Sequence, residues 1–199
     1  MSPFIETIRI LDGSSQNLRY HQLRFEKTRQ DSCDLKNHPS LDQVIRVPER
    51  FRKGLCKCRI LYGRNIDLIE YEPYEISAVS SLKLVYSESI SYRYKFSNRS
   101  VLKELFAQRG SCDDIIIVRR GFVTDSYTAN VIFWNGSGWV TPDTPLLPGT
   151  MRASLLEKGV LTKERITMED LSRFQQIRLI NAMKDMDTGD PIPLNALIL

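Results

Sequence analysis

The first half of the chain alternates between strand-like and helix-like patterns of hydrophobic and polar positions. Residues 4–10, FIETIRI, alternate their side chains as a strand does, and the turn-forming LDGSSQ follows, so a hairpin is expected. The spacing becomes helical in residues 20–32, YHQLRFEKTRQDS. Beyond them the sequence predicts a short helix flanked by loops within 36–53, then a second strand pair over 55–63 and 65–75.

A serine-rich segment, residues 76–91, leads from this half to a second one. We place the domain boundary near residues 80–92. The expected division is a smaller N-terminal α+β domain over residues 1–82 and a larger C-terminal α+β domain over residues 83–199.

The second half is expected to contain both helices and strands. A strand is predicted around Lys95, a hairpin turns at residues 135–138, and a helix over 151–159 ends at Gly159, as helices commonly do. The remaining predicted elements are a helix over 99–109, an apolar strand over 113–118 and a closing α+β region over 164–183.

Composition and charge limit the classes of protein. The chain has 199 residues, 42% of them hydrophobic and 26% charged, which is ordinary for a soluble globular protein. The net charge of +4 is small and the basic residues are scattered, so nucleic acid binding is not indicated, whereas a small anionic ligand fits. No run approaches the ~20 apolar residues that span a bilayer, and the first ten residues do not resemble a signal peptide. We expect a cytoplasmic protein without membrane contact.

Cysteine and histidine usage argues against several kinds of site. The four cysteines lack CxxC spacing, and Cys56 and Cys58 would share one face of a strand, so reduced thiols are expected. Only two histidines, His21 and His38, are present. A zinc site or a Ser-His-Asp triad is therefore improbable, and an enzyme with this sequence would need another acid-base group.

Lys95 lies among aromatic residues in YRYKFSNRS, residues 92–100. One interpretation is that its stem covers its neighbours while the charged head stays in water. The other is chemical, because lysine loses its proton readily when buried and then becomes a nucleophile. Taken alone, the stretch favours the first interpretation, since lysine is mostly an exposed residue.

Two further features could act together with this amine. Asp125 is an acid among apolar and hydroxylic residues in VTDSYTANVIFW. Gly149 precedes a predicted helix start, which would direct the amides of Thr150 and Met151 at an anion. An amine, an acid and an anion cradle are the parts that hold pyridoxal phosphate. Each has a plainer interpretation: Asp125 as a turn residue, the helix start as a site for water or a side-chain cap.

The order and wording of these segments resemble the class IV aminotransferase family, the fold-type IV pyridoxal phosphate enzymes. FIETIRI is similar to the family's Phe-Glu-(Thr/Gly)-Ile-Arg strand, and HQLRFEKT to its His-x-x-Arg-Leu helix. YKFSNR looks like the segment with the Schiff-base lysine, VTDSYTANVIFW like the segment with the ring-pairing acid, and PGTMR like the phosphate-binding turn. The resemblance covers residues from about 4 to about 185.

The resemblance implies roles for particular residues. Arg24, otherwise expected to be a solvated cation, would grip the cofactor phosphate, and Lys95 would form the Schiff base. Asp125 would pair with the pyridine nitrogen, and Thr150 and Met151 would bind the phosphate. The family usually has glutamate at the position of Asp125, and the chain begins inside the family's first hairpin.

The same resemblance implies a fold and an assembly. We expect a two-domain α+β enzyme, similar to D-amino acid aminotransferase, that binds pyridoxal 5'-phosphate in the cleft between its domains. A homodimer with active sites near the interface is also expected. No metal and no nucleic acid partner is predicted.

The reaction class stays open between a lyase and an aminotransferase, because both use the same core residues. The motifs GTMR, ANVIFW and NAM resemble those of aminodeoxychorismate lyase, which releases 4-aminobenzoate and pyruvate, and this resemblance favours the lyase. The alternatives are transfer of amino groups from branched-chain or D-amino acids, and a non-catalytic binding homologue. The candidate substrate residues are Phe4, Arg59 and Asn181. Arg59 could bind a carboxylate bidentately, or it could be an ordinary exposed strand arginine. Asn181 could line the pocket, or it could occupy a plain core position.

Overall fold

The computed structural model describes residues 3–198 and divides into two compact units. Unit 1 comprises Met1–Ile76 and Tyr94–Asn98, and unit 2 comprises Ser77–Arg93 and Arg99–Leu199. The division thus lies earlier in the chain than the expected boundary, and the segment with Lys95 returns to the first unit.

Backbone hydrogen bonds explain why this segment returns. The amide of Ile5 donates to the carbonyl of Lys95 over 2.9 Å, and the amide of Ser97 donates to the carbonyl of Pro3 over 2.9 Å. Only Phe96 forms a bridge pair, with Phe4. The strand expected around Lys95 is therefore a short extended segment that lies along the strand starting at Phe4.

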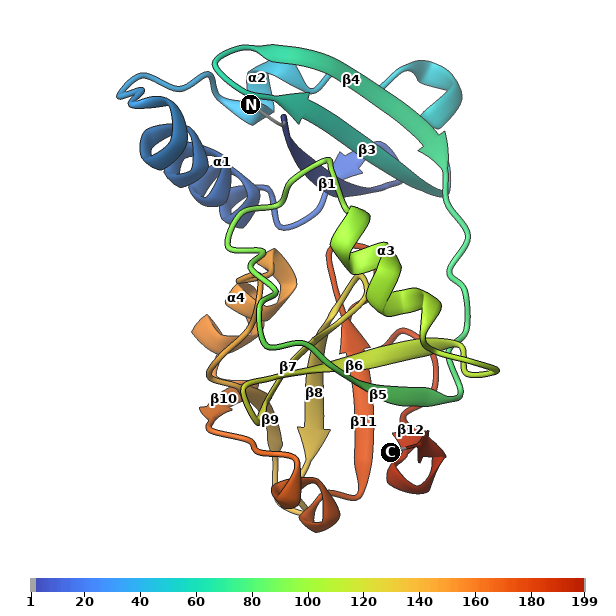
Figure 1. Ribbon diagram of the computed structural model, residues 1–199. Coiled ribbons are helices and arrows are strands. Elements are labelled where there is room, and N and C mark those ends of the chain that lie inside the picture. Colours follow the sequence, from blue (N-terminus) through green and yellow to red (C-terminus); the bar gives the residue numbers. More distant parts are fainter. Residues whose placement is uncertain (1–2, 199) are drawn as a thin grey trace. The chain divides into compact units, whose positions relative to one another are not determined.

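Unit 1 is built on an antiparallel four-stranded sheet with the strand order β2-β1-β3-β4 (Figure 1). Its strands are β1 (Phe4–Leu11), β2 (Ser14–Ser15), β3 (Leu55–Tyr62) and β4 (Ile66–Pro73). Asp12 and Gly13 join β1 to β2 with positive φ angles of 48° and 79°. Two consecutive positive φ angles make a tight two-residue turn, for which Asp-Gly is a favoured pair, so the expected hairpin is confirmed.

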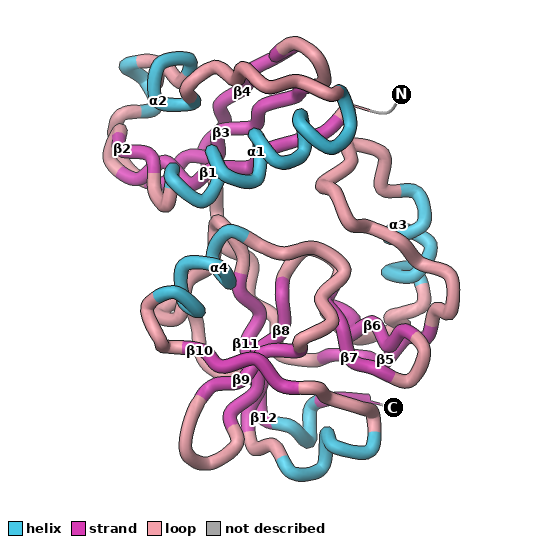
Figure 2. The backbone as a smooth tube through the Cα atoms, turned by 90° about the vertical axis from the view of Figure 1, so that its left-hand side faces the viewer, coloured by secondary structure: helices cyan, strands magenta, loops and turns pink. Residues whose placement is uncertain are grey.

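The helix α1 (Leu18–Cys33) supplies core residues that pack on this sheet (Figure 2). The ring of Phe25 lies 4.7 Å from that of Tyr62, centroid to centroid. Even-numbered positions of β1 and β3 are buried on the same face, as the two-residue period of a strand requires. A short helix, α2 (Leu41–Val44), and a 3₁₀ turn (Glu49–Phe51) follow in the region where a short helix was predicted.

Unit 2 contains a nine-stranded mixed sheet with the main order β10-β9-β8-β7-β6-β5-β13. The strand β11 pairs with β8 and with β12. The bounds are β5 (Leu82–Tyr86), β6 (Asp114–Arg119), β7 (Phe122–Ser126), β8 (Asn130–Trp134), β9 (Trp139–Pro142), β10 (Leu161–Glu164), β11 (Gln176–Ile180), β12 (Ile192–Pro193) and β13 (Leu197–Ile198). Sheets with helices in both units confirm the α+β class.

Tight turns determine how β6 to β9 follow one another. Arg120 and Gly121 connect β6 to β7 with positive φ angles of 51° and 79°. Between β8 and β9, the side-chain oxygen of Asn135 accepts hydrogen bonds from the amides of Ser137 and Gly138. The hairpin predicted at residues 135–138 is confirmed.

Two helices of unit 2 appear where the pattern predicted them. They are α3 (Ser100–Ala107) and α4 (Thr150–Glu157). The first residue of α4 follows Gly149 directly, as expected. Short 3₁₀ helices cover Glu169–Arg173 and Leu194–Ala196.

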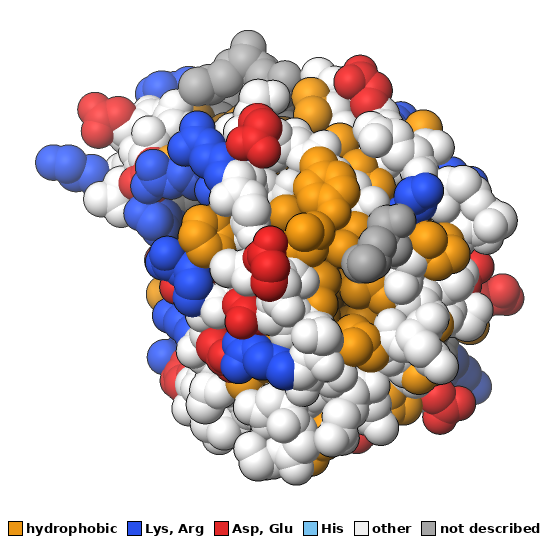
Figure 3. All heavy atoms as spheres, turned by 60° about the horizontal axis from the view of Figure 1, so that its bottom comes forward, with side chains coloured by type: hydrophobic (Ala, Val, Ile, Leu, Met, Phe, Trp, Pro, Cys, Tyr) orange, Lys and Arg blue, Asp and Glu red, His pale blue; other side chains and the backbone are white. Residues whose placement is uncertain are grey.

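All four cysteines are free thiols, as the sequence predicted. Within residues 3–198, no cluster of three or more His, Cys, Asp or Glu side chains could hold a metal, and no helix is long and apolar enough to cross a bilayer. Figure 3 shows hydrophobic side chains grouped in the middle of one face of the molecule. The exposed large hydrophobic residues described in unit 2 are Tyr86, Val101, Val160 and Ile198.

Candidate active site

A buried carboxylate organises the charged residues of unit 1. Glu6 of β1 has no exposed surface and accepts hydrogen bonds from two residues of α1. Arg24 donates from Nε to Oε1 over 2.8 Å and from Nη2 to Oε2 over 2.6 Å. His21 Nδ1 lies 2.6 Å from Oε2. Because His21 and Arg24 are three residues apart, they lie on the same face of α1 and reach one carboxylate together.

The ion pair determines the charge of Glu6, and burial that of His21. Burial alone would raise the pKa of Glu6, but the Arg24 charge and the hydrogen bonds from His21 and Arg24 lower it to about 2. Burial lowers the pKa of His21, against the opposing effect of its bond to Glu6. Glu6 is therefore ionised at neutral pH, and a neutral His21 donates its Nδ1 hydrogen to the carboxylate.

Lys95 belongs to the same unit as this cluster. Its side chain is half-buried, and its charge is among the causes that lower the pKa of His21, after burial and the charge of Arg24. The neighbouring rings of Tyr94 and Phe96 both pack on Phe4, with centroid distances of 5.9 and 5.1 Å. The structure thus brings two predicted site residues, Arg24 and Lys95, into one electrostatic environment.

Asp125 of β7 is one of two buried acids of unit 2; the other is Asp114 of β6. Its Oδ1 accepts a hydrogen bond from Asn130 Nδ2 over 2.7 Å, and its Oδ2 accepts one from the amide of Leu147 over 2.9 Å. Burial is the largest influence and raises the pKa of Asp125 to about 6, although hydrogen bonds from Asn130 and from the backbone of Leu146 and Leu147 lower it, as does the charge of Arg152. The direct donors are neutral, so the charge of this carboxylate is compensated less than that of Glu6.

The start of α4 lies against the side chain that holds Asp125. A Cβ atom on Gly149 would be only 2.0 Å from Asn130 Oδ1, so glycine is required here for space. The φ of −71° would suit any residue. Thr150 and Met151 are buried in the first turn of α4, where backbone amides have no acceptor inside the helix. Asp125, Thr150 and Met151 thus lie in one unit.

These features of unit 2 match the chemistry of pyridoxal phosphate. A carboxylate accepts up to about four hydrogen bonds, so Asp125 can accept one more, from a protonated ring nitrogen. The helix start favours a phosphate through its amides and its dipole. Ser154, in the second turn of α4, has a buried hydroxyl oxygen with no hydrogen-bond partner in the described structure. The close approach of Asn130 also excludes a side chain at Gly149, the residue that precedes the helix.

The three candidate substrate residues have different surroundings. Phe4 is a buried core residue of unit 1. Arg59 lies half-exposed on the sheet face opposite that core and pairs with Glu70 over 3.3 Å. The side-chain oxygen of Asn181 accepts hydrogen bonds from the amides of Met183 and Lys184 after β11, which is a turn-forming role. Substrate contacts by these three residues stay predictions.

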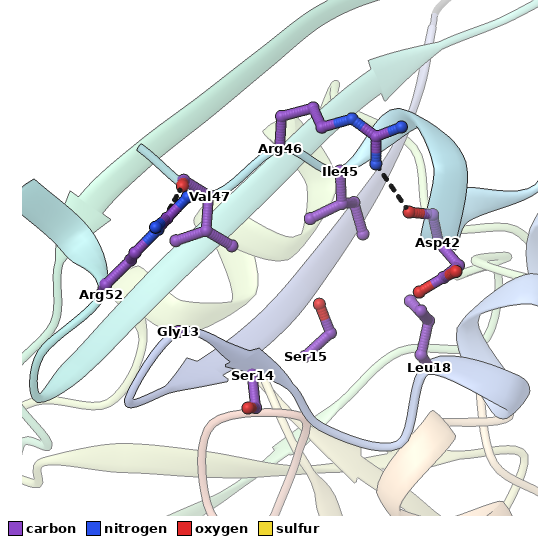
Figure 4. Close-up of a pocket in the computed structure, with 9 residues that line it drawn as sticks. All are labelled: Gly13, Ser14, Ser15, Leu18, Asp42, Ile45, Arg46, Val47 and Arg52. Atoms are coloured by element: carbon purple, nitrogen blue, oxygen red, sulfur yellow. Dashed lines mark hydrogen bonds between the residues drawn. The ribbon is translucent and has the colours of Figure 1, made fainter. Parts of the chain in front are cut away.

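A pocket of about 610 Å³ occurs elsewhere in unit 1 (Figure 4). In Figure 4, Arg46 donates to the carbonyl of Asp42 over 3.2 Å and Arg52 to that of Val47 over 3.3 Å. None of the predicted site residues is among the residues that line it, which are Gly13, Ser14, Ser15, Leu18, Asp42, Ile45, Arg46, Val47 and Arg52. The candidate residues instead belong to the cluster around Glu6 within unit 1 and to the cluster around Asp125 within unit 2.

Glu6, His21 and Asn130 were not predicted from the sequence to take part in these two clusters. Glu6 could have been found, because it is the one polar residue at the alternate positions of β1 that are otherwise filled by Phe4, Ile8 and Ile10. A carboxylate on the buried face of a strand needs a buried partner. The contact between Asn130 and Gly149 joins residues 19 positions apart and leaves no local pattern.

The Glu6 ion pair should make stability depend on pH. The folded pKa of about 2 lies below the ordinary value of 4.5, so the stabilisation is fully present above pH 4.5 and is lost as the pH falls toward 2. Its size is on the order of 3 kcal/mol. Urea unfolding from pH 7 to pH 2.5 should show Glu6→Gln strongly destabilised at pH 7 and close to the wild type at the lowest pH.

Glu72→Gln is the matched control for this measurement, because Glu72 forms an exposed pair with Lys57 in the same sheet. We expect it to change the free energy of unfolding by less than about 1 kcal/mol. A difference between Glu6→Gln and the wild type that stays constant across the pH range would contradict the assignment.

The contact at Gly149 predicts a second effect. In Gly149→Ala the new methyl group collides with Asn130, which is also bound to Asp125 and to the carbonyl of Leu147, so the whole cluster must shift. We expect a loss of about 1–3 kcal/mol in the free energy of unfolding. Gly138→Ala is the control, since a Cβ there meets no atom within 4 Å. Equal stability of the two variants would rule out the steric explanation.

Comparisons with known proteins identify the family. The profile of the Amino-transferase class IV family matches residues 4–186. An uncharacterized protein from Haemophilus influenzae is 38% identical over 188 residues, which is 94% of this chain and 100% of the relative.

Solved structures agree with this match. A crystal structure from Haemophilus somnus 129PT, provisionally assigned as 4-amino-4-deoxychorismate lyase, has a TM-score of 0.87 and 38% identity over 94% of this chain and 98% of its own. A provisionally assigned aminotransferase from Mycobacterium tuberculosis, solved with pyridoxal phosphate, has the same fold, with a TM-score of 0.78 and 18% identity over 98% of this chain and 81% of its own. The resemblance inferred from the sequence is confirmed, and the chain belongs to the class IV aminotransferase family.

Proposed function

We propose that this protein is a pyridoxal phosphate-dependent enzyme that converts 4-amino-4-deoxychorismate to 4-aminobenzoate and pyruvate. The observation that carries the cofactor assignment is Asp125, a carboxylate that is buried beside neutral donors and suits a cationic ring nitrogen. Support for the lyase reaction comes from the likeness to the Haemophilus somnus protein along nearly the full length of both chains.

Each unit contains residues to which the proposal gives a role. In unit 2, Asp125 keeps the ring nitrogen protonated, and the first-turn amides of Thr150 and Met151 bind the phosphate. In unit 1, Arg24 offers guanidinium donors to the phosphate, and Lys95 supplies the amine that attaches the cofactor. When bound, pyridoxal phosphate withdraws electrons from the bonds of the substrate carbon that bears the amino group.

Lys95 also performs the proton transfers in this proposal. Once released from the cofactor, its neutral amine takes the proton from the carbon that bears the substrate's amino group. The carbon–oxygen bond at the neighbouring carbon then breaks, and the departing three-carbon enolate is protonated to pyruvate. His21 is buried and hydrogen-bonded to Glu6, which leaves Lys95 as the acid-base group.

Replacement of Lys95 tests the attachment of the cofactor. Lys95→Ala should abolish both turnover and the visible absorbance band of the lysine-bound cofactor, because no other residue takes over the amine. Pyridoxal phosphate should still bind without a covalent bond through its phosphate, which equilibrium dialysis would measure. Lys53→Ala, an exposed lysine of unit 1, should keep both band and turnover. A normal band in Lys95→Ala would assign attachment to another lysine.

A paired assay tests the reaction class. One reaction contains 4-amino-4-deoxychorismate alone, and the other contains an amino donor with a 2-oxo acid. A lyase releases pyruvate and 4-aminobenzoate in the first without a keto acceptor, since elimination needs no second substrate. Amino exchange in the second reaction with no product in the first would make the protein an aminotransferase.

A further inference from the structure

We infer that Glu6 is a positioning residue: its carboxylate holds the Arg24 guanidinium in the one orientation that presents the remaining donors to the cofactor phosphate. The inference rests on the proposed function and adds to it a residue that would never contact the cofactor itself. Three observations carry it, namely the geometry of the ion pair, the rigidity of its support and the use of the guanidinium edges.

The ion pair has bidentate geometry. Both carboxylate oxygens are engaged by Arg24, through Nε at 2.8 Å and Nη2 at 2.6 Å. A paired fork of this kind fixes the plane of the guanidinium as well as its distance, which a single bond to a lysine could not do. His21 adds a third donor at 2.6 Å from Oε2 and limits rotation of the carboxylate.

The support of the carboxylate is rigid. Glu6 lies inside β1 and pairs with Ile60 of β3, and its side chain is completely buried. The two elements that carry the pair are themselves anchored in the core, since Ile8 of β1 and Phe25 of α1 are both buried there. The carboxylate therefore cannot follow a moving arginine, and Arg24 must adapt to Glu6.

The bidentate pair also determines where the other donors point. Glu6 engages the Nε–Nη2 edge of the guanidinium, so Nη1 is directed away from the carboxylate. The Arg24 side chain is 15% exposed while that of Glu6 is 0% exposed, so the outward end of the pair is the arginine. Because the pair as a whole is neutral, orientation of the donors matters more for phosphate binding than net charge.

Orientation of the guanidinium and charge alone would have different consequences for phosphate binding. If only charge mattered, loss of the negative Glu6 would strengthen phosphate binding, and Glu6→Asp would change little. If orientation matters, both substitutions weaken it. In Glu6→Gln an amide donor must face a donor of Arg24 or His21, and in Glu6→Asp the carboxylate is withdrawn by one methylene group.

The test compares the affinities for pyridoxal phosphate and for pyridoxal, measured by absorbance titration of the full chain freed of cofactor. Both aldehydes react with the Lys95 amine. The dissociation constant for pyridoxal divided by that for pyridoxal phosphate therefore isolates the contribution of the phosphate. We expect Glu6→Gln, Glu6→Asp and Arg24→Gln each to lower this ratio by about tenfold or more, and Glu72→Gln to stay within about twofold of the wild type. General loosening of the fold would weaken the binding of both aldehydes alike and leave the ratio unchanged.

A second variant decides the matter where Glu6→Gln does not fold. Arg24→Lys retains the positive charge and removes the fork, and we expect its ratio to fall as far as that of Arg24→Gln. A wild-type ratio retained in Arg24→Lys, or in a folded Glu6→Gln, overturns the inference alone. A wild-type protein with no preference for the phosphate overturns the proposed function, and with it the role of Glu6.

Discussion

The structure depends on how two of its buried carboxylates, Glu6 and Asp125, are compensated. Removing a carboxylate from water is costly, and the protein either supplies partners or the group takes up a proton. Glu6 has an arginine and a histidine, and its pKa falls to about 2. Asp125 has only neutral direct donors, the side-chain amide of Asn130 and backbone amides, and its pKa rises to about 6. The same functional group therefore has two states: Glu6 in unit 1 is already paired with a cation, whereas Asp125 in unit 2 can still accept a hydrogen bond from a cationic partner.

The environment of Asp125 also explains why the local backbone is so constrained. Asn130 donates to Asp125 and to the carbonyl of Leu147, and its oxygen lies where a side chain at Gly149 would begin. One amide thus connects β7, β8 and the segment that leads into α4. A shift of any of them changes the position of the acid and of the helix start together.

The sequence predicted most elements because their signals are local. The Asp-Gly turn, the alternation in β1 and the helical spacing of residues 20–32 all depend on neighbours within a few positions, and the structure contains the expected hairpin and helix. The segment around Lys95 was misjudged as a strand, because its aromatic residues favour one. In the structure Tyr94 and Phe96 instead pack on Phe4, and a single bridge forms. Contacts across 90 residues of sequence cannot be inferred from either segment alone.

The same distinction applies to the candidate site. Three candidates could be recognised in the sequence because each offers one chemical group: the amine of Lys95, the carboxylate of Asp125 and the backbone amides at the start of α4. Glu6, the partner of Arg24, requires one further step, because a strand glutamate indicates a site only once the apolar alternate positions of its strand show that its face is buried. Burial converts an ordinary side chain into one whose partners are compulsory. A polar residue on the apolar face of a predicted strand is therefore a stronger indication of a site than a charged residue in a loop, since only the former must be compensated by the fold.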